Sequence, residues 1–294
     1  MLLKSLESLT HSETRANRYL VQKCWRLGRR FCVRCGGPKL YRLVDKRYRC
    51  ARCGYTFHDF TGRWIDALNL SSAQWLWVAK LVELEFSPGR IALEIGISYP
   101  TAFKAIHIIR CAIFSEFAQG QTEDERSALL AFLETCRLGS CDSVRLGFGI
   151  TDKNRHATIN AVNSLTPHGL RAAGTAVTRR GAALYSDRLA EYDAVLFTGA
   201  WPGSSETTSA KKIYVDGADG FWKFLREFLA LRHGVSRERF PLYLVECQLR
   251  YHHRDQPAFE LLVKYLTNLV PNYLQSVPRD GLKKNVANLR RVSR

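Results

Sequence analysis

Two Cys-x-x-Cys pairs near the amino terminus restrict what this chain can fold into more than any other feature. The pairs are Cys32/Cys35 and Cys50/Cys53, and fourteen residues separate them. Each pair fits a short turn, and two facing turns can place four thiolates at the corners of a tetrahedron, the geometry that Zn2+ prefers with sulfur ligands. Buried free thiols or disulfides would leave this paired spacing to chance. We therefore predict a zinc ribbon over residues 30–62.

The residues around the cysteines fit this interpretation. Gly36 and Gly54 follow the second cysteine of each pair, where the chain must bend back past the metal. His58 lies just beyond the ribbon, but four cysteines already fill the coordination sphere, so we predict that it is not a ligand. The loop between the pairs is basic and aromatic, which predicts a basic face: Lys39, Tyr41, Arg42, Lys46, Arg47, Tyr48 and Arg49.

The charge of the chain indicates its class of partner. Lys and Arg outnumber Asp and Glu by 44 to 27 over 294 residues, and the net charge is +17. Such an excess attracts polyanions, of which nucleic acid is the commonest for a soluble protein. A membrane surface would require a basic amphipathic helix with a broad apolar face or a lipidation signal, and the sequence shows neither.

Cellular location is inferred from the start of the chain and from the remaining cysteines. The first fifteen residues are too polar for a signal peptide. Five cysteines lie outside the two pairs, an odd number without framework spacing, which indicates a reducing cytoplasm: Cys24, Cys111, Cys136, Cys141 and Cys247. Cys136 and Cys141 could bind a metal together, although packed thiols are the simpler interpretation.

Two helical regions flank the ribbon. Residues 1–29 form a predicted basic helical arm that either contacts phosphates or is a solvated lead-in. Over residues 70–118, Ser71-Ser72 and Ser87-Pro88-Gly89 predict helix starts. Gly96 ends the second of these helices.

The third helix of this region begins at Ser98. A short helix, a turn with Gly96 and a second helix form the helix-turn-helix pattern, although a plain three-helix bundle has the same pattern. In the DNA-binding form, polar residues at the start of the third helix reach base edges in a major groove. The predicted DNA-binding residues are Ser98, Tyr99, Thr101 and Lys104.

The periodicity changes after a polar linker at residues 120–126. Short apolar or alternating runs predict strands at 129–133, 144–150, 156–162, 182–187 and 194–197, and longer periodic runs predict helices at 216–231, 237–252 and 258–269. Residues 271–294 form a basic tail. The fold class is therefore multi-domain α/β, with a metal site expected at the strand ends.

With these motifs, the chain resembles insertion-sequence transposases built from a zinc ribbon, a helix-turn-helix and a DDE-type nuclease domain, over roughly residues 30–265. The matching stretches are Cys32-x-x-Cys35-Gly36, Tyr48-Arg49-Cys50-x-x-Cys53-Gly54-Tyr55-x-Phe57, Thr61-Gly62, Glu94-Ile95-Gly96-Ile97-Ser98-Tyr99-x-Thr101, Tyr185-Ser186-Asp187, Gly217-Ala218-Asp219-Gly220-Phe221-Trp222 and Tyr243-Leu244-x-Glu246. The resemblance implies a ribonuclease-H-like α/β core at residues 126–270, which cleaves and joins DNA with two Mg2+ ions.

The resemblance also implies the catalytic residues, with two departures from the pattern. Asp187 matches the second acid of the family. Asp219, expected in the first turn of a helix, stands where the third acid is usually the longer glutamate. Glu134 fits the first position, with Asp142 as the alternative, but Leu133 replaces the aspartate that precedes it in the family.

Several residues around this set allow two interpretations. Lys223 and Arg226 either hold DNA phosphate or form a solvated helix surface. Phe221 and Trp222 are predicted to be core rather than base-stacking groups. His252 and His253 are adjacent, and neighbouring side chains on a helix point about 100° apart, so we interpret them as polar packing or phosphate contacts rather than as a metal site.

The sequence thus predicts a DNA transposase in the bacterial cytoplasm, associated with the nucleoid. Its expected partners are double-stranded DNA, as element terminal repeats and target, and further copies of itself in a homodimer or higher oligomer, the latter by resemblance only. Its expected cofactors are structural Zn2+ and catalytic Mg2+. The first alternative is a catalytically impaired, transposase-derived DNA-binding protein. A zinc-stabilised regulator that binds RNA or protein is a weaker third hypothesis.

Overall fold

The structure is a computed structural model, and it forms two compact units. Unit 1 contains residues 1–112 and 257–271, and unit 2 contains the described part of residues 113–256. The structure describes residues 1–25, 28–121, 123, 126–127, 147–153, 156–162, 194–198, 220–232, 235 and 239–271. All structural statements below concern these residues.

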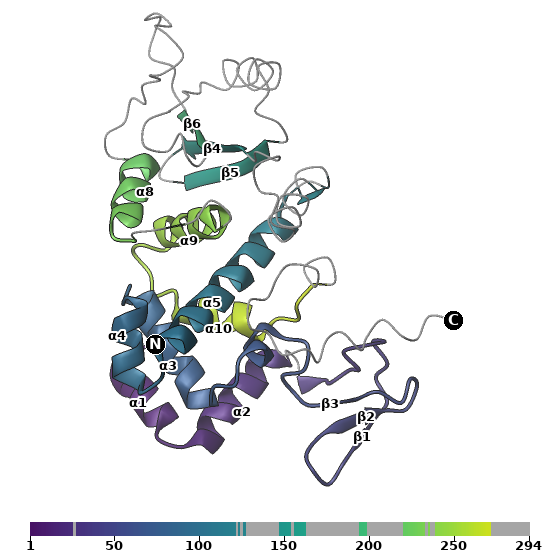
Figure 1. The fold of residues 1–294 in the computed structure, drawn as a ribbon. Helices are drawn as coiled ribbons and strands as arrows, with labels where there is room; N and C mark the ends of the chain where they lie inside the picture. Colours follow the sequence, from purple (N-terminus) through teal and green to yellow (C-terminus); the bar gives the residue numbers. More distant parts are fainter. Residues whose placement is uncertain are drawn as a thin grey trace, which may run out of the picture. The chain divides into compact units, whose positions relative to one another are not determined.

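Unit 1 is a helical body joined to a small three-stranded sheet (Figure 1). Its helical segments are α1 (Leu3–Thr10), α2 (Glu13–Cys24), the 3-10 helix η2 (Trp64–Ala67), α3 (Ser72–Glu83), α4 (Pro88–Ile95), α5 (Tyr99–Gln119, which continues past residue 112) and α10 (Phe259–Thr267). Helix α3 contacts α1, α2, α4 and α10, so it lies at the centre of the helical body. Its Trp75, Leu76 and Ala79 are almost completely buried there.

The start of α3 is fixed by polar groups from two places in the sequence. The Ser71 side chain accepts a hydrogen bond from the backbone N–H of Gln74, and the Gln74 side chain accepts one from the N–H of Ser71. The Glu13 carboxylate of α2 accepts hydrogen bonds from the N–H groups of Ser72 and Ala73, at 2.6 and 3.0 Å. A carboxylate at this end also complements the helix dipole. The predicted helix start is therefore confirmed, with an acid from a neighbouring helix as a second cap.

Helix α4 begins and ends where the sequence predicts, and α5 begins where it predicts. Ser87 caps α4 through its side-chain oxygen and Pro88 occupies the first turn. Gly96 ends α4 in the left-handed region, with a φ of 66°, which glycine adopts without steric cost. Only residues 96–98 separate α4 from α5, and the Ser98 hydroxyl accepts a hydrogen bond from the N–H of Thr101.

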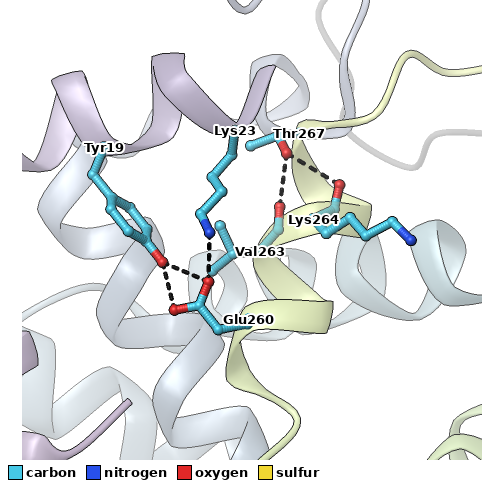
Figure 2. A network of polar contacts seen from close by, with 6 residues as sticks. All are labelled: Tyr19, Lys23, Glu260, Val263, Lys264 and Thr267. Carbon is cyan, nitrogen blue, oxygen red and sulfur yellow. Dashed lines mark hydrogen bonds and ion pairs between the residues drawn. The ribbon is translucent and has the colours of Figure 1, made fainter. Parts of the chain in front are cut away.

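Helix α10 returns from the far end of the sequence to pack against the amino-terminal helices. Figure 2 shows Tyr19 and Lys23 of α2 both directed at the Glu260 carboxylate, with donor–acceptor distances of 2.7–2.8 Å. The N–H of Phe259 donates to Glu83 of α3 at 2.7 Å. We expected residues 258–269 inside the ribonuclease-H-like domain, but these contacts place α10 in unit 1.

The amino-terminal arm is likewise part of unit 1 rather than a separate lead-in. Helices α1 and α2 pack against α3, and Leu6, Ala16 and Leu20 are buried at these contacts. Lys23, one of the basic residues that we considered for phosphate contact, forms an ion pair with Glu260.

Unit 2 contains a mixed three-stranded sheet. Strand β4 (Gly147–Lys153) is central, pairs antiparallel with β5 (His156–Val162) and pairs parallel with β6 (Ala194–Thr198). Strands β5 and β6 lie where the sequence predicts them, and β4 lies three residues later than expected. The strands predicted at 129–133 and 182–187 lie outside the described residues.

Unit 2 also contains helices α8 (Phe221–Ala230) and α9 (Phe240–His252), which contact each other. Phe221 is fully buried, as predicted, with its ring edge-on to Tyr251 at 5.2 Å. His252 accepts a hydrogen bond from the N–H of Ala157 in β5, and the Gln248 amide donates to the carbonyl of the same residue. The polar-packing interpretation of His252 is therefore confirmed.

Candidate metal centre and nucleic-acid interface

The ribbon is a short antiparallel sheet that holds two cysteine-containing turns. Strand β1 (Leu40–Arg42) pairs with β2 (Tyr48–Cys50), and β2 pairs with β3 (Thr56–Phe57). Cys50 ends β2, and it lies opposite Leu40 in the register.

The two Cys-x-x-Cys turns have the same backbone hydrogen bonds. The N–H of Gly36 donates to the carbonyl of Cys32 at 2.8 Å, and the N–H of Gly54 donates to the carbonyl of Cys50 at 3.0 Å. Both glycines have positive φ, 72° and 68°, as expected where the chain bends back after each pair. Each turn therefore directs its two thiols toward the thiols of the other turn.

The four sulfur atoms lie close enough to share one metal ion. The Cys32–Cys53 and Cys35–Cys50 sulfur distances are both 3.6 Å, and all four atoms lie within 4.8 Å of one another. A tetrahedral zinc site with Zn–S bonds of about 2.3 Å has sulfur–sulfur edges of about 3.8 Å. Among the described residues, no other group of three or more Cys, His, Asp or Glu side chains meets the same criterion. The cluster therefore supports a structural Zn2+ bound by four cysteines.

His58 is not part of the cysteine cluster and makes other contacts. Its Nε2 lies 3.4 Å from the Asp66 carboxylate, and its Nδ1 accepts a hydrogen bond from the N–H of Phe60. This agrees with the prediction that it is not a ligand.

The thiols of the cluster differ in how easily they lose their protons. Hydrogen bonds from the N–H groups of Cys53 and Arg52 lower the pKa of the Cys50 thiol to about 7. Burial raises the pKa of the Cys32 thiol to about 12. Because a metal binds thiolates, Zn2+ must displace the remaining protons, and its affinity rises with pH.

Gly37 is a further residue of the metal site, and it was not predicted from the sequence. A Cβ atom at this position would lie 3.3 Å from the sulfur atoms of both Cys35 and Cys50, which is tighter than ordinary van der Waals contact. Only glycine leaves that space to the sulfurs. The Gly-Gly doublet after the first cysteine pair was the available signal, but only its first member was interpreted.

The ribbon shares a hydrophobic core with the end of α2. Cys24 and Trp25 pack with Cys32, Cys50 and Phe57 in one buried cluster. The Trp25 indole N–H and the Arg30 guanidinium both donate to the carboxylate of Asp59, at 2.5 and 2.8 Å. The predicted domain boundary between residues 29 and 30 therefore crosses a packed interface.

The predicted DNA-binding residues lie together at the start of α5. Ser98, Tyr99 and Lys104 are exposed, and Thr101 is half-buried with its hydroxyl 2.8 Å from that of Ser98. The Tyr99 ring stacks on Phe103 at 6.3 Å and remains 56% exposed. The helix thus presents polar and aromatic groups at its amino-terminal end, as contact with a major groove would require.

Glu134, Asp142, Asp187 and Asp219 all lie outside the described residues, as does the side chain of Arg226. Helix α8 begins at Phe221, with Gly220 as its extended N-cap residue.

Lys223 lies on an exposed position of α8. The side chain of Trp222 and the cysteines at 136 and 141 also lie outside the described residues.

Comparison with known proteins supports the ribbon. Residues 11–56 match a family model described as the transposase zinc-ribbon domain. The match includes all of α2, which agrees with the shared core of α2 and the ribbon. Comparisons with curated proteins and with solved structures gave no significant match. Within the described residues, no helix is both long and apolar enough to span a membrane.

Proposed function

We propose that this protein is a DNA transposase of an insertion sequence, which binds the element ends and catalyses metal-dependent DNA strand cleavage and transfer. The observation that carries the proposal is the convergence of four cysteines within a segment that matches the transposase zinc-ribbon domain. The net charge of +17 further favours a polyanionic partner.

End recognition is assigned to the start of α5. Gly96 ends α4 and Ser98 caps the start of α5, so the two helices and the three-residue connection between them have the form of a helix-turn-helix. Ser98, Tyr99, Thr101 and Lys104 reach base edges and phosphates of the terminal repeats in this proposal.

Catalysis is assigned to three carboxylates from separate parts of the chain. Glu134, or Asp142 in its place, would hold two Mg2+ ions together with Asp187 and Asp219. Such a pair of ions activates the attacking oxygen and stabilises the leaving oxygen of an in-line displacement. Lys223 and Arg226 contact DNA phosphate near the metals. The active form is a homodimer or higher oligomer on nucleoid DNA, because two element ends must be joined to one target.

The test is a strand-transfer assay with labelled terminal-repeat duplexes and Mg2+. Asp187→Asn should abolish cleavage and joining while leaving duplex affinity unchanged. Lys104→Gln should weaken duplex binding and reduce its salt dependence by about one phosphate contact. If wild-type protein binds the duplex but cuts it in no divalent metal, the transposase proposal is wrong.

The departures at the first and third acids favour the second candidate, a transposase-derived DNA-binding protein without nuclease activity. Leu133 and Asp219 stand where the family has aspartate and glutamate. Displacing a metal-holding group by about 1 Å costs on the order of 100-fold in rate. In that case Asp187→Asn leaves every measurable activity unchanged, whereas Lys104→Gln still weakens DNA binding.

A further inference from the structure

The ribbon sheet has two faces with opposite chemistry. In the register of β1 and β2, Leu40 lies opposite Cys50 and Tyr41 lies opposite Arg49. Side chains directly opposite each other share a face, and successive residues alternate between faces. Leu40 and Cys50 therefore belong to the inner face, which packs in the cluster with Trp25. Tyr41 and Arg49 belong to the outer face, and both are exposed.

The three tyrosine rings of the ribbon also differ in their contacts. On the inner face Tyr48 packs against Phe57 with ring centroids 5.9 Å apart, and the Arg30 guanidinium lies 5.1 Å from the Tyr48 ring. The Arg34 guanidinium lies 5.6 Å from the Tyr55 ring. Tyr41, in contrast, is 54% exposed and has no ring or cation contact with any described residue. It is the one tyrosine of the ribbon whose ring has no stacking partner in the described structure.

Two cations share the outer face with this ring. Lys39 precedes Tyr41 by two residues. The N–H of Ala51 donates a hydrogen bond to the carbonyl of Lys39, so the pairing of β1 with β2 continues one residue beyond Leu40 and Cys50. Lys39 therefore lies on the outer face with Tyr41 and Arg49. Neither cation has an ion-pair partner in the described part of the chain.

The local charge is strongly one-sided. Residues 30–56 contain eight Lys and Arg and a single acid, Asp45, which is paired with Arg47 at the hairpin turn. The outer face therefore combines a positive surface with an open aromatic ring. These are the two components of surfaces that bind single-stranded nucleic acid, where bases stack on aromatic groups and cations follow the backbone.

We propose that the outer face of the ribbon sheet binds an unpaired stretch of DNA, with a base stacked on Tyr41 and the flanking phosphates held by Lys39 and Arg49. Stacking on a ring requires an unpaired base, because both faces of a paired base are covered by its neighbours in the duplex. This surface is separate in sequence from the start of α5, to which duplex recognition is assigned. The inference rests on the proposed function, since a strand cut at an element end gains a free terminus that can separate from its complement.

The experiment uses the full-length, zinc-loaded protein and two fluorescein-labelled probes, a 12-nucleotide mixed-sequence single strand and a duplex of the same sequence. Binding is followed by fluorescence anisotropy at several salt concentrations. The variants are Tyr41→Ala, the stacking-competent Tyr41→Phe, Arg49→Gln, and Val44→Ala as a matched control at the fully exposed hairpin tip. Zinc content and thermal melting of each variant establish that the ribbon is folded.

Base stacking contributes about 1–3 kcal/mol per base, so Tyr41→Ala should weaken single-strand binding by about fivefold or more, whereas Tyr41→Phe and Val44→Ala stay within about twofold of wild type. Arg49→Gln should lower the slope of log affinity against log salt by about 0.7. Duplex affinity should be unchanged in Tyr41→Ala.

The proposal is overturned if wild-type protein does not bind the single strand, or if Tyr41→Ala binds it as wild type does. It is also overturned if Tyr41→Ala weakens duplex and single-strand binding equally, because the surface would then be a general cationic contact. Failure of strand transfer, with the Tyr41 effect present, would instead contradict the proposed transposase activity alone.

Discussion

The guanidinium of Arg63 donates a hydrogen bond to the backbone carbonyl of Thr267, which lies 204 residues further along the chain. The same side chain donates to the carbonyl of Asp59 at 3.0 Å and lies 4.5 Å from the ring of Trp25. Next to it, the N–H of Val270 donates to the carbonyl of Gly62 at 2.9 Å. A single buried arginine therefore joins the region just after the ribbon to the end of α10.

Arg63→Met should destabilise unit 1 by about 2–4 kcal/mol, because it leaves the buried carbonyl of Thr267 and the partly buried carbonyl of Asp59 without their charged donor. The measurement is chemical denaturation followed by circular dichroism. Arg18→Met, an exposed substitution on α2, is the matched control and should change stability by less than about 0.5 kcal/mol. Equal stability of the two variants would show that the Arg63 contacts contribute nothing.

Acid should loosen the contact between α10 and α2. Burial alone would raise the pKa of Glu260, but the hydrogen bonds from Lys23 and Tyr19 outweigh it and hold the pKa below its ordinary 4.5. The carboxylate therefore stabilises the fold fully above about pH 4.5, and this contribution is lost as the pH falls through the lower folded pKa. The stability difference between wild type and Glu260→Gln, measured from pH 7 to pH 3, should shrink over that range. A pH-independent difference would contradict the charge-based explanation.

Zinc removal should disorder more than the ribbon. Cys32 and Cys50 pack in the same cluster as Cys24 and Trp25, so the loss of the metal loosens the carboxyl-terminal end of α2 as well. With a chelator, hydrogen exchange should accelerate at the amides of Gly36 and Gly54 and in the last turn of α2. The amides of the β4–β5 ladder in unit 2 are the internal control, and they should retain their protection.

A matched cysteine pair checks the ligand assignment. Cys53→Ser should reduce the bound zinc measured by mass spectrometry, whereas Cys111→Ser on α5 should keep one zinc per chain. Full zinc occupancy in Cys53→Ser would contradict a four-cysteine site.

Gly37→Ala should weaken zinc binding by about tenfold or more, since its new methyl group crowds two sulfur atoms whose positions the metal fixes. Competition with a chromogenic chelator measures this affinity. Gly89→Ala is the comparison, because its methyl group would meet nothing within 4 Å in the first turn of α4. That substitution should leave zinc affinity unchanged and stabilise the protein by about 0.4–1 kcal/mol. Equal zinc affinities would show that Gly37 has no role at the site.

Local chemistry explains which parts of the fold were predictable from the sequence. Ser71, Ser87 and Gly96 act on backbone groups within three or four residues, so the positions of α3, α4 and α5 could be predicted directly. The metal cluster was equally predictable, because the geometry of a Cys-x-x-Cys turn is fixed within the turn and zinc prefers four sulfur ligands in a tetrahedron.

The docking of α10 could not be predicted in this way. Glu260, Arg63 and Glu83 find partners that are far away in the sequence, and nothing in the local pattern of residues 258–269 distinguishes packing on α2 from packing on the neighbouring α9. Strand β4 lies three residues later than the sequence predicts for a related reason. Its glycines at 147 and 149 give no alternating pattern, so its ends are set by pairing with β5 and β6.

Because α10 belongs to unit 1 but lies near the end of the sequence, it determines when unit 1 can complete its fold. A ribosome synthesises α1–α5 early, but the donors and acceptors supplied by Phe259, Glu260 and Thr267 emerge only after all of unit 2 has been translated. A truncated protein that ends before residue 257 would therefore contain the ribbon and the exposed start of α5, but it would lack α10, which packs on α2 and α3.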